Sequence, residues 1–310
     1  MPAGFVASAC AICGPGTGSA ELYPATFGVE HLTAAVFSAR RLPDRVHYRV
    51  VRCDACGLVR SDPVAGGEVL AALYVESTFD YVAETENLKR TYGRYLARLD
   101  GHRAGHGALL EIGCGNGFFL ERALEMGYRS VAGVEPSHAA VESARADIGP
   151  VVVRDLMREG LFMEGSFDVV CLFQVFDHVP DPRALLRAVH LALRPGGLLL
   201  VLNHDVESRS ARLLKDRSPI IDIEHTYLYS RRTLRRILEL EGFDVVESGG
   251  VSNTYSARYL ARLLPLPAGI KRALLDVLGR TPIGRLRASV PLGNLYAVGR
   301  RREAGTNPVP

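Results

Sequence analysis

The stretch LLEIGCGNGFFL, residues 109–120, decides the fold of this chain. Its first four residues form a mostly apolar run that is typical of a buried strand, and a helical pattern follows from residue 117. Glycines at positions 113, 115 and 117 let the backbone adopt positive φ and approach a ligand closely. A helix that begins at such a turn also presents free N–H groups to that ligand. The stretch predicts a ligand-binding turn between a strand and a helix, although its G-x-G-x-G spacing differs from the dinucleotide pattern G-x-G-x-x-G.

Beyond this stretch the chain alternates between strands and helices. We expect strands at 130–136, 151–154, 167–174, 198–203, 243–248 and 294–300, and helices at 117–126, 137–147, 181–193 and from residue 230. The alternation is typical of an α/β fold, in which helices cover both faces of a parallel sheet and ligands bind at the carboxyl ends of the strands. Glu135 ends the second strand, 18 residues after Gly117, where its carboxylate can accept hydrogen bonds from ribose hydroxyls. The alternative for Glu135 is a solvated carboxylate at a strand end.

Four motifs then occur in the order and at the spacing of a known family: LLEIGCGNGFFL, VAGVEPS (131–137), FDVVCLFQVFDHVPDP (167–182) and LRPGGLLLVLN (193–203). From about residue 106 to 248 the chain resembles the class I methyltransferases that depend on S-adenosylmethionine (SAM). The resemblance implies a Rossmann-like domain whose seven-stranded sheet ends in an antiparallel hairpin. It also implies methyltransferase activity, with SAM at the carboxyl ends of the first four strands.

The same resemblance assigns residues to SAM. The residues that would hold it are Glu111, Gly113, Gly115 and Gly117 at the methionine portion, Glu135 at the ribose, Asp155 at the adenine amino group, and Phe173 and Gln174 along the pocket wall. Asp155 can also be read as a simple helix cap, and Phe173 as plain core. Asp177 stands where this family often has glutamate before the histidine of an E-H-V-P-D-P stretch. The shorter side chain keeps the charge, so we expect SAM binding to be kept.

Four of the six cysteines form two pairs near the N-terminus. Cys10-x-x-Cys13-Gly14 and Cys53-x-x-Cys56-Gly57 supply four thiolates, which is enough for a closed tetrahedral zinc site. The glycine after each pair permits the tight turn that wraps a metal. Such a site would be structural, because no coordination position remains open. The alternatives are redox pairs or coincidence, while Cys114 and Cys171 lie in apolar strands and are expected to be buried thiols.

The order of these motifs resembles a narrower subgroup. The pairs, RVVRCDACGLVRSDP (49–63) and LYVESTFDY (73–81) precede the methyltransferase motifs, as in enzymes with an N-terminal zinc-binding domain. That subgroup includes C-methyltransferases of nucleotide-linked deoxysugars and relatives in natural-product and glycan pathways. The sugar enzymes carry a further C-terminal domain for which this sequence leaves no room, so the acceptor stays open.

The acceptor side of the site must remove a proton if the methyl group goes to a hydroxyl or to a carbon beside a carbonyl. IDIEHTYLYS (221–230) resembles the E-H-x-x-Y stretch of the sugar C-methyltransferases, which makes His225 the candidate base and Glu224 its helper. His178 is the nearest competitor, and Tyr81 matches a tyrosine that closes over the site in relatives. A hydrogen-bonded loop histidine is the alternative for His225.

The predicted organisation has four parts. A zinc-binding module occupies 1–65, a helical linker or cap 66–103, the SAM-binding domain 104–302, and a disordered tail 303–310. A helical insertion at about 255–290 is expected to form a lid or a dimer surface, with peripheral membrane contact as an alternative. We find no secretory signal and no membrane-spanning run, so a cytoplasmic monomer or homodimer is expected.

Three functions fit these features. The first is C- or O-methylation of a small molecule, nucleotide-linked sugar or glycan. The second is RNA methylation with the cysteine module binding substrate, against which the net charge of only +3 argues. The third is a SAM-binding protein without catalysis that serves protein partners. No part of the SAM motif is broken, which favours an enzyme.

Overall fold

The computed structural model describes residues 4–26, 28, 45–76, 85–102, 106–263 and 266–303. Tyr81 and the tail 304–310 lie outside the described residues. Among the described residues, no helix is both long and apolar enough to cross a membrane.

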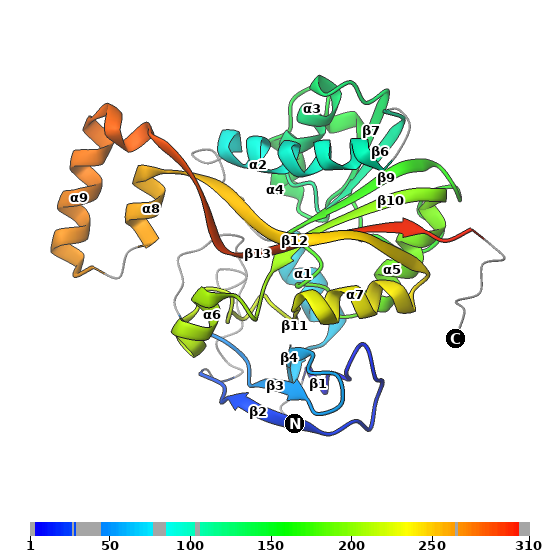
Figure 1. The fold of residues 1–310 in the computed structure, drawn as a ribbon, viewed down its shortest axis with the longest axis horizontal. Helices are drawn as coiled ribbons and strands as arrows, with labels where there is room; N and C mark the ends of the chain where they lie inside the picture. The colour runs from blue at the N-terminus through cyan, green and yellow to red at the C-terminus, as the bar shows by residue number, and fades with distance from the viewer. Residues whose placement is uncertain are drawn as a thin grey trace.

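A seven-stranded sheet forms the centre of the molecule (Figure 1). Its order is β12-β13-β10-β9-β6-β7-β8. The five consecutive strands from β10 to β8 are parallel to one another. The strand β13 pairs antiparallel with both β10 and β12, which confirms the predicted terminal hairpin. The strands are β6 (Ala108–Ile112), β7 (Ser130–Val134), β8 (Val152–Val153), β9 (Phe167–Phe173), β10 (Leu193–His204), β12 (Phe243–Ser256) and β13 (Arg287–Arg301).

Helices cover both faces of this sheet because successive strand side chains point to opposite sides. Leu109 packs in one buried cluster with residues of the helices α2 and α3, and its neighbour Leu110 packs in another with residues of α5 and α7. The covering helices and short 3-10 turns are α2 (Thr85–Ala97), η2 (Arg98–Gly101), α3 (Phe118–Glu125), α4 (His138–Glu142), η3 (Gly149–Val151), α5 (Pro182–Ala192) and α7 (Arg231–Leu240). The fold is therefore the predicted α/β class, although α4 is much shorter than the helix expected at 137–147.

The strands β12 and β13 are longer than the sequence indicates. Their pairing continues to Ser256 and Arg287, past the end of the neighbouring strand β10, and forms a two-stranded arm. The arm carries α8 (Ala257–Leu263), α9 (Ala268–Arg280) and η5 (Pro282–Arg285), which correspond to the expected insertion (Figure 1). Alternation alone did not reveal the extra strand length, because a two-stranded arm buries little on either face.

A second, four-stranded sheet contains Cys53, and the other three N-terminal cysteines lie in turns outside its strands. Its order is β11-β4-β3-β2, so the strand β11 (Tyr227–Leu228), which follows the predicted acceptor loop, completes it. The other strands of this part are β1 (Phe5–Val6), β2 (Ser19–Tyr23), β3 (Val50–Cys53), β4 (Val59–Ser61) and β5 (Val64–Ala65). The remaining helices are α1 (Gly67–Val75), α6 (Arg209–Leu214) and η4 (Lys215–Arg217). The cysteine module thus shares its sheet with the SAM-binding part of the chain.

Candidate active site

All three glycines of the turn after β6 have positive φ, and at two of them an added Cβ atom would also clash. Gly113 has φ of 71° and Gly117 has φ of 73°, which are strained for any other residue. A Cβ atom on Gly113 would lie 2.3 Å from a methyl of Val175, and one on Gly117 would lie 2.3 Å from a methyl of Ile148. The backbone of the turn is held by hydrogen bonds from the N–H of Gly113 to the carbonyl of Val134 and from the N–H of Gly117 to that of Cys114.

Glu135 stabilises this turn through two hydrogen bonds. One carboxylate oxygen accepts a hydrogen bond from the N–H of Gly115 and the other from that of Ser137, each at 2.9 Å. Burial raises the pKa of Glu135, and the two hydrogen bonds oppose that rise. Each oxygen keeps a second lone pair, so the side chain can hold the loop and still accept hydrogen bonds from a ribose.

Glu111 is the most deeply buried acid on the SAM side of the site. Its side chain is 2% exposed at the end of β6, and its Oε2 has no hydrogen-bond partner among the described residues. Burial, with a contribution from the charge of Glu135, raises its pKa well above the ordinary value. A buried acceptor without a partner fits a ligand that brings its own donor, such as the ammonium group of SAM.

Replacing Glu111 with glutamine is expected to stabilise the ligand-free protein at neutral pH and to change little near pH 4. The raised pKa means that the folded protein keeps a proton that the unfolded chain releases at a pKa of about 4.3. The stability of the wild type is therefore greatest below that value and falls as the pH rises towards the folded pKa. Urea unfolding of both proteins between pH 4 and 7.5 measures this, and a difference that stays constant with pH would contradict it.

All but one of the residues predicted to hold SAM line a single cavity of about 1770 Å³. Glu111, Gly113, Gly115, Glu135, Asp155, Phe173 and Gln174 line it. Gly117 does not line it and instead starts α3. Asp155 pairs with Arg158 at 2.8 Å, and Phe173 stacks on Tyr92 with ring centroids 4.2 Å apart. Tyr92, which sequence reasoning missed, also lines the cavity.

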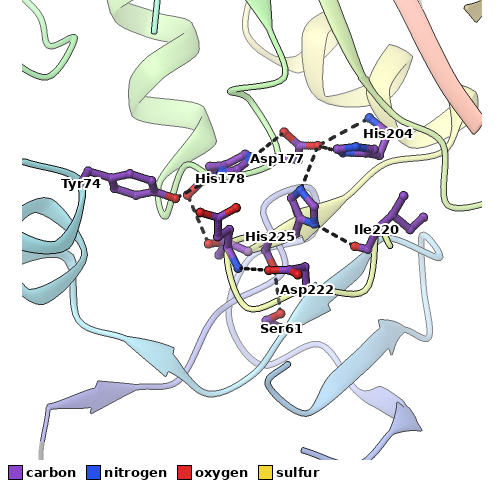
Figure 2. A network of polar contacts seen from close by, with 10 residues as sticks. Ser61, Tyr74, Asp177, His178, His204, Ile220, Asp222 and His225 are labelled. Atoms are coloured by element: carbon purple, nitrogen blue, oxygen red, sulfur yellow. Dashed lines mark hydrogen bonds and ion pairs between the residues drawn. The ribbon is translucent and has the colours of Figure 1, made fainter. Parts of the chain in front are cut away.

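The acceptor side of the cavity holds three histidines around one carboxylate (Figure 2). Asp177 is 1% exposed, and its Oδ2 lies 2.6 Å from Nδ1 of His204. Nε2 of His178 lies 3.7 Å from Asp177 Oδ1, and Nε2 of His225 lies 4.0 Å from Oδ2. The structure thus brings the two predicted histidines together, with ring centroids 4.8 Å apart.

Three members of this cluster, Asp177, His204 and Tyr74, were not predicted as site residues. His204 ends β10 beside Asn203, and its position at the carboxyl end of a parallel strand is the sequence signal that could have identified it. Tyr74 of α1 places its hydroxyl 3.2 Å from Nδ1 of His178. Tyr81, the predicted tyrosine, lies outside the described residues.

The electrostatics of the cluster favour a charged carboxylate at Asp177 and neutral rings at His178 and His225. Burial would raise the pKa of Asp177, but the charge and hydrogen bond of His204, with smaller contributions from the other two rings, lower it on balance. Burial lowers the pKa of His178 to about 3, which Asp177 only partly offsets. Burial and His204 likewise lower the pKa of His225.

The loop that carries Glu224 and His225 is fixed by the cysteine module. Nδ1 of His225 lies 2.9 Å from the carbonyl of Ile220, so this nitrogen must carry the proton, because a carbonyl only accepts. The carbonyl of His225 accepts from the hydroxyl of Ser61 in β4 at 2.8 Å (Figure 2). Glu224 is buried beside it and lines the same cavity.

The four N-terminal cysteines converge on one point. The sulfur atoms of Cys10, Cys13, Cys53 and Cys56 all lie within 4.8 Å of one another. The sulfurs of Cys10 and Cys56 are 3.5 Å apart, close to the spacing of about 3.8 Å expected for thiolates about 2.3 Å from a tetrahedral zinc ion. Gly14 and Gly57 have positive φ at the ends of the two turns. The donor set and its geometry fit a structural zinc ion.

Comparison with known proteins identifies the protein family of the part of the chain that is expected to bind SAM. The family model "Methyltransferase domain" matches residues 85–248. A ubiquinone biosynthesis O-methyltransferase of Neisseria meningitidis serogroup C (strain 053442) is 32% identical over 112 residues, 34% of this chain and 47% of that protein. The protein of the same name from Caulobacter sp. (strain K31) is 36% identical over 102 residues, 30% of this chain and 39% of that protein. The matches span less than half the length of these relatives.

One solved structure supports the fold. A chain of the complex between the Haloferax volcanii Trm112 methyltransferase activator and its methyltransferase aligns with a TM-score of 0.51 and 18% identity. The alignment covers 73% of this chain and 94% of that one. At this identity the likeness concerns the fold alone.

Proposed function

The chain belongs to the methyltransferase domain family, and on that premise we propose that it transfers a methyl group from SAM to a small-molecule acceptor beside the histidine cluster. The observation that carries the proposal is the shared cavity. The glycine turn with Glu111 and Glu135 lines one part of it, and His178, His204, Glu224 and His225 line another. When bound, SAM would supply a methyl group activated by a positively charged sulfur, and Glu111, Glu135 and the glycine turn would hold it.

The residues of this chain have separate roles in the proposal. The glycine turn and Glu135 bind and orient the donor, and the buried Glu111 accepts from its ammonium group. Orientation is a large part of catalysis in a methyl transfer. At the other end, the cluster of His178 and His225, with Glu224, assists the loss of the acceptor's proton.

The lining of the cavity includes several cationic side chains besides the carboxylates of Asp222 and Glu224. They include Arg217 before the acceptor loop, Arg258 and Arg262 of α8, and Lys271 of α9. Guanidinium and ammonium groups favour phosphate or carboxylate partners. We therefore propose an anionic small acceptor, methylated on oxygen or carbon, as in natural-product or glycan biosynthesis. The helices α8 and α9 would act as the lid of this site.

The test is acceptor-dependent formation of S-adenosylhomocysteine. Purified full-length protein is incubated with SAM and a panel of anionic acceptors, including hydroxybenzoates and nucleotide-linked ketosugars. Product should form with at least one acceptor and should be absent with the Gly113→Ala variant, whose added Cβ meets Val175. Tight SAM binding without product on phenolic, sugar and carboxylate acceptors would contradict the proposal.

Replacing Glu135 with alanine is expected to weaken SAM binding by about 1–3 kcal/mol, the range for losing a hydrogen bond to a charged group. The loss has two sources, because Glu135 faces the cavity and also holds Gly115 in place. Calorimetric titration with SAM measures the effect. Glu142→Ala, an exposed acid on the neighbouring helix, is the matched control and should bind SAM as the wild type does. Equal affinity of the Glu135 variant would show that the ribose is held elsewhere.

A further inference from the structure

The histidine cluster has the arrangement of a metal site. Asp177, His178 and His225 each offer one ligand atom, and these atoms all lie within 4.8 Å of one another. Ligands about 2.0–2.2 Å from one metal ion lie roughly 3–4 Å apart. The nitrogen-to-oxygen distances of 3.7 and 4.0 Å match that spacing and are too long for hydrogen bonds.

The unused atoms of the cluster point to the same conclusion. Oδ1 of Asp177 is fully buried and makes no hydrogen bond within the described part of the chain. The Nε2 atoms of His178 and His225 face this carboxylate, and these contacts, drawn in Figure 2, are longer than hydrogen bonds. A buried carboxylate oxygen without a hydrogen bond is costly, and a cation held between this carboxylate and the two Nε2 atoms would satisfy it.

Each of these groups is held by a partner on its far side. Nδ1 of His225 donates to the carbonyl of Ile220 at 2.9 Å, which leaves the lone pair on Nε2. Nδ1 of His178 contacts the hydroxyl of Tyr74, and His204 holds Oδ2 of Asp177. Metal-binding histidines and carboxylates have such outer partners, which fix the tautomer and the orientation of the ligand.

We propose that Asp177, His178 and His225 bind a divalent zinc-class ion that holds the oxygen of the acceptor. Two imidazoles and a carboxylate suit zinc or cobalt better than magnesium. Three protein ligands leave a coordination position open, as in catalytic rather than structural zinc sites. His178 and His225 line the cavity, so this position is reached from the acceptor side.

The inference rests on the proposed function for its role and selects oxygen as the methylated atom. A hydroxyl bound to such an ion has a lowered pKa and loses its proton to water. The resulting oxyanion forms the new O–CH₃ bond while the bond between methyl carbon and sulfur breaks, and the electron pair stays on the sulfur. In this arrangement the two histidines act as metal ligands, and the metal ion promotes loss of the acceptor's proton.

The experiment counts zinc in the full-length protein. After equilibration with zinc and removal of free metal, the wild type should hold two zinc ions per chain. Asp177→Asn and His178→Gln should each hold one, while His190→Gln, which changes a histidine outside the cluster, should hold two. Cobalt substitution identifies the site that is lost, because the thiolate charge-transfer absorption of the cysteine site should persist in the cluster variants.

His204→Gln provides a graded test, because His204 touches the carboxylate and is not a ligand. It should keep the second zinc but bind it about 10–100-fold more weakly. One zinc per chain in the wild type, or two in both cluster variants, would overturn the proposal. If the second zinc binds but its removal leaves turnover unchanged, its role in methyl transfer is wrong. If zinc binds and no acceptor is methylated, the proposed function fails and the metal site stands.

Discussion

Replacing His225 with asparagine is expected to lower kcat by about 10²–10⁴ and to leave SAM affinity unchanged. His225 lies on the acceptor side of the cavity, away from the glycine turn, and belongs to the cluster that draws the proton from the acceptor. Asparagine is polar and smaller, so the loop, which is held through the backbone carbonyl of His225, should keep its position. Single-turnover rates at saturating SAM, with calorimetry for SAM binding, separate the two effects.

His178→Asn is the paired variant, and His190→Asn is the matched control outside the cluster. The metal arrangement predicts comparable losses for His178 and His225, because each supplies one ligand. If His178→Asn abolishes turnover while His225→Asn barely changes it, His178 is the group that handles the proton. Full activity in both variants would mean that the acceptor ionises without help from this cluster.

Replacing Cys53 with serine is expected to remove the N-terminal zinc and to lower stability severely. Zinc sites of this donor type contribute about 10–16 kcal/mol of apparent binding free energy in small domains, and much of that is lost with one ligand. Cys10, Cys53 and Cys56 belong to the same buried hydrophobic cluster as Leu234 and Ile237 of α7, so we expect the loss to reach the methyltransferase core. Metal content together with thermal unfolding measures the effect.

Cys171→Ser is the control for the loss of a buried thiol. Cys171 lies in β9, outside the cysteine cluster, and its variant should keep the full zinc content. A wild-type protein that is metal-free and fully folded, with all four N-terminal thiols freely reactive, would contradict the zinc assignment.

Local patterns predicted the α/β fold of the methyltransferase part well. The glycine turn and Glu135 could be placed because the strand, turn and helix that hold them are consecutive in the chain. Contacts between distant segments could not be predicted in this way. Tyr74 and His204 reach His178 and Asp177 from separate parts of the sequence, and the motifs in or beside which they lie give no sign of that contact. Asp177 was noted only as a departure from a family pattern, whereas the structure places it at the centre of the cluster.

The glycine positions show a second limit of sequence reasoning. Gly113, Gly115 and Gly117 share one motif, yet only the first two line the cavity. Gly117 is required by its backbone conformation and by the nearness of Ile148, a packing reason that spacing does not reveal.

The pairing of β4 with β11 determines when the cysteine module can be completed during synthesis. Ser61 and His225 are 164 residues apart, so the ribosome must make most of the chain before the fourth strand of the small sheet exists. Until then a nascent chain exposes the unpaired edge of β4, which can pair with strands of other chains. A recombinant fragment that stops before residue 227 would carry the same exposed edge. Expression of the N-terminal part alone is therefore expected to yield aggregates, even when zinc is supplied.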